Sequence, residues 1–174
     1  MKAVGNFFFA VVVAGFTLAT GVIHADTGDL VGNQMRNAGV ERCIEQWDRV
    51  GRFLAKNTRS LGSHTTHQTD DPDGRMANAV VEENFADGSI LAVSSISPTV
   101  GGGCDVTLVR INTTADHCFT RASEIEGGQV EGTLTQRVLR VSQPGATTSY
   151  MLPSVSGEDC TMVSVETMYL PMDD

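Results

Sequence analysis

The sequence predicts an α+β protein in which one main N-terminal helix packs on an antiparallel sheet of about six strands, braced by two disulfides. Apolar residues recur at helical spacing in one segment near residue 40, and several later segments are strand-like and joined by tight turns. The four cysteines form an even set. A helix followed along the chain by closely connected strands indicates an antiparallel sheet with the helix on one face.

The main helix is expected at residues 40–56, where apolar residues recur three and four positions apart and form one stripe. Trp47, the only Trp of the chain, lies in the middle of this stripe and is expected to anchor the core. Residues 26–39 are polar and contain three glycines, which predicts a loosely ordered lead-in with a helical turn near residues 30–35. The stripe comprises Val40, Cys43, Ile44, Trp47, Val50, Phe53 and Leu54.

Six segments are expected to form strands, and they follow a long polar loop at residues 59–75. Asp-Gly at 87–88 and Pro-Gly at 144–145 each separate two such segments, which predicts two hairpins. Residues 104–111 are partly apolar on both faces, as in a central strand, and residues 118–126 fit either a short helix or a strand. The expected strands are residues 76–85, 89–97, 104–111, 138–141, 147–152 and 160–170.

The first 25 residues have the pattern of a cleaved secretory signal peptide. Lys2 precedes an apolar stretch at residues 7–18, and Ala25 is an acceptable residue before the cleavage point. The apolar run is shorter than the roughly 20 residues that a membrane-spanning helix needs. The first cysteine is Cys43, so a lipid-attachment cysteine is missing from the cleavage point. We therefore expect release as a periplasmic or secreted protein without a stable membrane anchor.

Cleavage after residue 25 would leave 149 of the 174 residues, the size of a single domain. We expect that domain at residues 40–174, preceded by the lead-in at residues 26–39. The full chain has a formal net charge of −9, and the loss of Lys2 takes it to −10. Nucleic-acid binding relies on clustered Lys and Arg, and the sequence has no such cluster, so this class is excluded. The acidic charge suits a basic protein partner, and it also favours solubility.

The four cysteines are expected to pair, because export delivers them to an oxidising compartment. Four cysteines allow three connectivities. We favour Cys104 with Cys118, as two strand ends joined by a short excursion, and Cys43 with Cys160, as a tie between the helix and the last strand. The competing interpretation, a structural zinc site, lacks the C-x-x-C spacing.

The most polar segment contains the candidate metal ligands. His64, His67 and either Asp70 or Asp71 would form a zinc site if the expected loop turned back on itself. Asp71 and Asp73 have the spacing of a calcium loop, but the remaining ligands and the distal Glu are missing. The alternative, which we favour, is a solvent-exposed loop rich in turn-forming residues.

No catalytic set is evident in the sequence. A G-x-S-x-G elbow is missing, and the glycines at residues 101–103 lead into a strand and not into a phosphate-binding helix. No cofactor is therefore expected. Asn112 begins an N-glycosylation acceptor triplet, which matters only if the source organism has that machinery.

A series of turns and cysteines follows the expected helix: Asp73-Gly74-Arg75-Met76, Asp87-Gly88-Ser89, Gly102-Gly103-Cys104, Cys118 and Cys160. In this order the chain resembles small exported bacterial proteins that contain disulfides and have no assigned activity. The resemblance spans most of residues 40–170. It implies a shared disulfide-braced fold and no catalytic residue.

These observations predict an exported, disulfide-stabilised binding protein of the inhibitor or immunity type, which acts on a protein partner in the envelope and is not an enzyme. Two alternatives stay open. One is a metal-dependent enzyme that uses His64, His67 and Asp70, and the other is an envelope structural or assembly factor.

Overall fold

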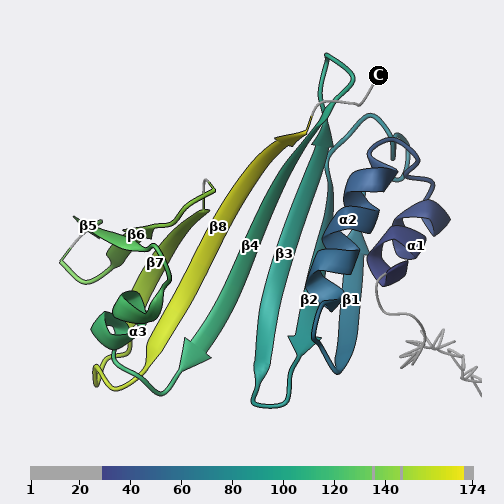
Figure 1. The fold of residues 1–174 in the computed structure, drawn as a ribbon. Helices are drawn as coiled ribbons and strands as arrows, with labels where there is room; N and C mark the ends of the chain where they lie inside the picture. Colours follow the sequence, from purple (N-terminus) through teal and green to yellow (C-terminus); the bar gives the residue numbers. More distant parts are fainter. Residues whose placement is uncertain (1–28, 135, 146, 171–174) are drawn as a thin grey trace, which may run out of the picture.

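The computed structural model describes residues 29–134, 136–145 and 147–170. They form one antiparallel sheet of eight strands in the order β1-β2-β3-β4-β8-β7-β6-β5, together with three short helices (Figure 1). The prediction of one main N-terminal helix on about six strands is therefore wrong, because the sheet is larger and the helical residues fall into three separate pieces. The predicted signal peptide at residues 1–25 lies outside the described residues.

Most strands pair with their neighbours along the chain, and the exception is at the centre of the sheet. There β4 pairs with β8 over its whole length, from Cys104 opposite Leu170 to Thr114 opposite Cys160. Within the described ranges, no helix is both long and apolar enough to cross a membrane. The helices are α1 (Leu30–Asn37), α2 (Ile44–Ala55) and α3 (Cys118–Glu124). The strands are β1 (Ser60–Thr66), β2 (Ala77–Asn84), β3 (Ser89–Pro98), β4 (Cys104–Thr114), β5 (Gln129–Thr133), β6 (Leu139–Ser142), β7 (Thr147–Pro153) and β8 (Cys160–Leu170).

Both predicted hairpins are confirmed. The Asp-Gly turn joins β2 to β3, where the Phe85 amide donates to the Gly88 carbonyl at 2.8 Å. The Pro-Gly turn joins β6 to β7, where the Gln143 amide donates to the Thr147 carbonyl at 2.9 Å. Glycine at position 88 suits a backbone φ of +158°, which other residues rarely adopt.

Strand β1 lies where the sequence predicted a loop. Its residues do not alternate between apolar and polar, so period-two reasoning cannot detect it. It is ordered by its register with β2 and by α1, because the Ser63 hydroxyl donates to Gln34 Oε1 at 2.8 Å. Helix α1 occupies most of the predicted lead-in and buries Val31 and Met35 completely.

The main core lies between the sheet and the pair α1 and α2. Trp47 is fully buried there, as predicted, and Leu54 lies on the same face of α2 and is also buried. Their partners on β2, β3 and β4 are mostly small or β-branched residues. These partners are Ala77, Ala79, Val81, Ala92, Ile96, Val106 and Leu108.

A second, smaller core lies on the same side of the sheet beneath α3. There Ala122 packs with Leu139, Val141 and Met151 of β6 and β7. The helices therefore form two separate groups on one side of the sheet, with β4 and β8 between them (Figure 1).

The disulfides join Cys43 to Cys104 and Cys118 to Cys160, so the favoured pairing of Cys104 with Cys118 and Cys43 with Cys160 is wrong. Cys104 begins β4 and Cys118 follows its other end, so a strand of roughly 35 Å separates them. A disulfide requires Cα atoms within about 7 Å. Each bridge instead ties one group of helices to the sheet, and the two disulfides indicate an oxidising environment.

Candidate functional site

The candidate site is the side of the sheet that faces away from the helices, which we call the open face. All three helices lie on the other side, as Figure 1 shows, and both cores are on that side. Side chains alternate between the two sides of a strand. The residues between the core positions of β2, β3, β4, β7 and β8 therefore project onto the open face.

Two neighbouring rows of apolar residues cross this face, and we call them the apolar double row. Residues directly opposite each other in a sheet have adjacent side chains, so the register defines each row. The rows cross five strands, and Val80 and Leu91 are 39% and 42% exposed while the others are half-buried. The first row comprises Val80, Val93, Val109 and Val165, and the second comprises Leu91, Ile111, Val163 and Tyr150.

Polar side chains border the apolar double row. On one side runs a row of hydroxyl and amide groups, in which the Ser95 hydroxyl donates to Asn78 Oδ1 at 2.7 Å. At the β1 and β2 edge, His64 continues the first row and Glu82 continues the second. At the other edge, Arg140 of β6 stands opposite Tyr150. The border row comprises Thr66, Asn78, Ser95, Thr107 and Thr167.

Arg140 is part of a charged cluster at this edge. Hydrogen bonds from Ser142 and then from Arg140 lower the pKa of the Glu131 carboxyl, and the nearby positive charge of Arg140 acts in the same direction. Glu131 therefore stays ionised and neutralises Arg140. The charge that remains at the opposite end of the second row is the carboxylate of Glu82, which has no ion pair with any described residue.

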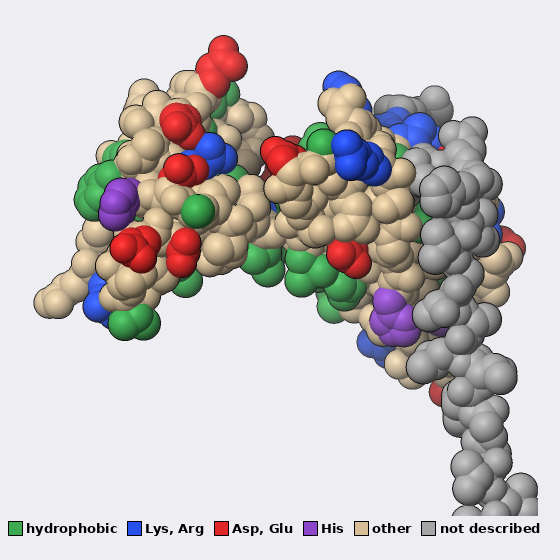
Figure 2. Space-filling view, turned by 90° about the horizontal axis from the view of Figure 1, so that it is seen from below, with side chains coloured by type: hydrophobic (Ala, Val, Ile, Leu, Met, Phe, Trp, Pro, Cys, Tyr) green, Lys and Arg blue, Asp and Glu red, His purple; other side chains and the backbone are tan. Residues whose placement is uncertain are grey.

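The open face is concave. Seen along the sheet from below, the molecule is hollowed on the side opposite to the helices, and hydrophobic side chains gather in the hollow (Figure 2). Contiguous apolar surface of this kind on a folded protein usually marks a binding site. A concave apolar floor with a polar border can receive a convex apolar partner and exclude water from the contact.

The candidate metal ligands lie in different places in the structure. His64 projects from β1 onto the open face, while His67 lines a polar hollow of about 730 Å³ at the end of β1 and β2. Asp70 is exposed, and Asp71 accepts the Gly74 amide at 2.9 Å. The described part of the chain contains no group of three or more His, Cys, Asp or Glu that could hold a metal ion.

The nearby Asp73 supports the fold. Its Oδ1 accepts the backbone amides of Glu41 and Arg42 at 2.6 and 2.7 Å, which fixes the loop to the turn before α2. Asp71 therefore has a role in a local turn, and Asp73 has a role in holding two distant segments together.

Nucleophilic catalysis has no geometric support among the described residues. His117 hydrogen-bonds the Gly157 carbonyl through Nδ1 at 2.5 Å, and none of the three described histidines has a hydrogen bond to a Ser, Thr or Cys side chain. A nucleophile needs a base within hydrogen-bond reach, so a triad is missing from this part of the chain.

The sequence contains one signal for the open face. Residues 104–111 are apolar on both faces, and a central strand with one face on the core must expose the other unless something covers it. The register between five strands decides which residues share a row, and the sequence of one strand does not contain this register.

No family model matches the chain, and comparisons with curated proteins and with solved structures find no similar protein. We therefore infer the function from the site itself.

Proposed function

We propose that the protein is an exported binding protein that docks a basic protein partner on its open face. The observation that carries the proposal is the apolar double row, which crosses five strands of a concave surface without a covering element among the described residues. The mode of action is that of an inhibitor or immunity protein, which masks a surface of its partner.

Charge favours a basic partner over a second copy of the chain. The net charge of −9 repels another copy and attracts a positively charged protein. Two concave surfaces also leave a gap when they face each other, whereas a convex surface fills the hollow. The border of the site is also negatively charged, because Glu82 carries a carboxylate and the charge of Arg140 is neutralised by Glu131.

The predicted export places the protein and its partner in the same compartment. The predicted signal peptide and the two disulfides agree with an oxidising compartment, so we place the protein in the periplasm or outside the cell. Two disulfides also hold both helix groups to the sheet, which keeps the open face in one shape before binding. A preorganised surface loses less entropy on association.

The test compares variants of residues 26–174. Leu91→Asp and Val109→Asp introduce charge into the apolar double row, and Val100→Asp, at a fully exposed position in the β3–β4 turn, is the matched control. Each variant is used as bait in an envelope extract, and the protein that the unaltered chain recovers is identified and purified. Its affinity for every variant is then measured by calorimetry at low and high salt.

We expect both open-face variants to weaken the binding of that partner at least tenfold, while the control variant leaves it unchanged. We also expect the affinity to fall as salt rises, because the partner is basic. Circular dichroism and urea unfolding check that the variants are folded. Equal binding by all variants would refute the proposal, and so would stable self-association that Val109→Asp abolishes, since the open face would then join copies of the chain.

A further inference from the structure

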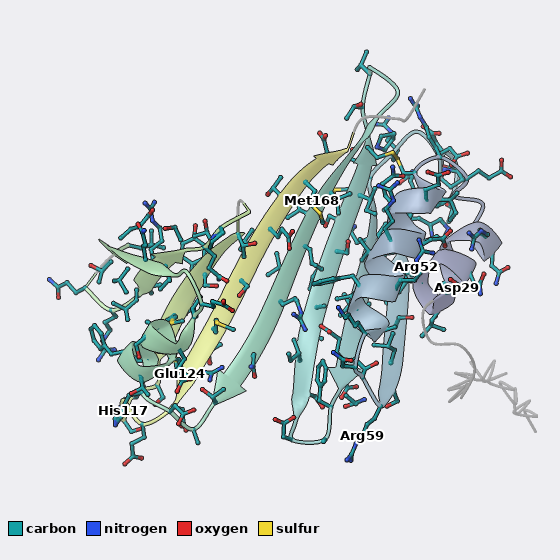
Figure 3. The ribbon with its side chains drawn as sticks, in the orientation of Figure 1. Asp29, Arg52, Arg59, His117, Glu124 and Met168 are labelled. Atoms are coloured by element: carbon teal, nitrogen blue, oxygen red, sulfur yellow. A yellow bond between two sulfur atoms is a disulfide. The ribbon has the colours of Figure 1, made fainter. Side chains whose placement is uncertain are left out.

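A groove crosses the opposite side of the sheet, between the two groups of helices. It consists of two adjoining hollows of about 250 and 240 Å³, which share Phe53, Leu108 and Glu166 in their walls. Strands β4 and β8 form the floor, and Met168 of β8 lies in this region on the same side as the helices (Figure 3). The two hollows together make an elongated site within the usual size range of small-molecule pockets.

The walls of the groove are mainly apolar and adaptable. Helix α2 contributes Phe53, which is 50% exposed, and the segment after α3 contributes Ile125. Two methionines lie on the β8 floor, and their unbranched thioether side chains fit ligands of varied shape. The apolar lining comprises Val50, Phe53, Val106, Leu108, Ile125, Met162 and Met168.

The positive charges of the groove are already engaged. The Arg110 Nε and Nη2 atoms donate to the two carboxylate oxygens of Glu83 at 3.0 and 2.8 Å, and its guanidinium lies 5.7 Å from the centre of the Phe53 ring. Arg49, at the other end, also has an interaction of its own. Neither guanidinium is therefore available as an isolated charge for an anionic ligand.

The negative charge of Glu166 is not compensated. Its side chain is half-buried at the junction of the two hollows and has no ion pair or hydrogen bond with any described residue. A carboxylate in a partly apolar groove attracts a cation more strongly than one in open solvent, because screening by water is weaker there. The groove thus combines an elongated apolar lining with one unpaired carboxylate at its middle.

We propose that this groove binds an elongated apolar molecule that carries one protonated amine. The amine pairs with the Glu166 carboxylate, and the hydrocarbon chain lies over Leu108 and Met168. An anionic head group would face the Glu166 charge, and a neutral one would leave that charge unpaired. The site is on the other side of the sheet from the open face, so it is independent of the protein-binding proposal.

The test uses decylamine, decanol and decanoate as probes with residues 26–174 in a calorimeter. The two charged probes are kept below their micellar concentrations, and decanol is kept below its solubility limit. We expect decylamine to bind with one-to-one stoichiometry, at least ten times more tightly than decanol, and decanoate to bind more weakly than decanol. Glu166→Gln should remove the preference for the amine and keep the affinity for decanol. Glu158→Gln, which removes an exposed acid in the β7–β8 turn, is the matched control and should keep the preference.

Three results would overturn the proposal. One is decanoate binding as tight as that of decylamine, which would show that an arginine of the groove binds the head group. Another is an equal loss of amine preference in both variants, which would show that the overall acidic charge attracts the amine. The third is an absence of decylamine binding at millimolar concentration to protein whose circular dichroism shows the folded sheet.

Discussion

Replacing Arg110 by Met should destabilise the protein strongly, because it leaves a charge unpaired in the core. Glu83 is only 1% exposed, and its two carboxylate oxygens both accept hydrogen bonds from Arg110. Met keeps much of the length of the arginine side chain. The substitution therefore removes the ion pair while it retains most of the apolar contact with Phe53.

The magnitude follows from the burial of the carboxylate. Breaking a buried ion pair by removing one partner typically costs about 3 to 5 kcal/mol. Loss of the cation–π contact with Phe53 adds about 0.5 to 1 kcal/mol. Single domains are stable by only about 5 to 15 kcal/mol, so Arg110→Met should remove a large part of the free energy of unfolding.

Removal of both charges should be far less costly than removal of one. In the double variant Glu83→Leu with Arg110→Met, no charge is left buried, and such replacements are often close to neutral. We expect its free energy of unfolding to lie within about 2 kcal/mol of the unaltered protein, well above that of Arg110→Met alone. This difference separates the cost of an unpaired charge from the loss of packing.

Urea unfolding followed by the fluorescence of Trp47 measures these free energies, because this fully buried residue is the only Trp of the chain. Arg140→Met is the matched control, since its ion pair with Glu131 is solvent-exposed and should contribute little to the free energy of unfolding. A cost of Arg110→Met no larger than that of this control would refute the prediction. A double variant as unstable as Arg110→Met would refute it too.

Two further predictions concern the disulfides and the polar loop. Reduction with dithiothreitol should lower the urea midpoint markedly, because disulfides that close loops of 61 and 42 residues contribute about 4 kcal/mol each in the chain-entropy model; an unchanged midpoint would contradict this role. Asp73→Ala should cost about 1 to 3 kcal/mol of unfolding free energy, because it frees the amides of Glu41 and Arg42. Asp70→Ala, at an exposed position, should change it little, and equal effects of the two substitutions would refute the structural role of Asp73.

Several elements were predictable because their signals are local. The stripe around Trp47 repeats with the period of a helix, and α2 forms there with Trp47 in the core. The Asp-Gly and Pro-Gly pairs favour tight turns, because glycine adopts the positive φ that such turns need, so both hairpins were predictable from these pairs. The sequence of α3 fits a helix and a strand equally, because its seven residues are too few to show a period.

Other elements depend on contacts between distant segments. Strand β1 has no run of alternating apolar residues, and it is defined by its pairing with β2, its hydrogen bonds to α1 and the packing of Leu61 against the core. Strand β5 is likewise exposed at every residue and is held by its pairing with β6. The cysteine pairing failed because the length of β4 separates Cys104 from Cys118, a distance that becomes evident only when the strand is placed in the sheet.

By itself, the sequence determined an antiparallel sheet, a Trp-centred helix, two hairpins and a set of four cysteines suited to disulfides. These properties follow from spacing along the chain. Only the tertiary structure decided which cysteines pair, which apolar residues share the open face, and that Glu166 lies between two hollows without a partner. The physical reason is strand register, because a shift of one residue would move every side chain of a strand to the other side of the sheet.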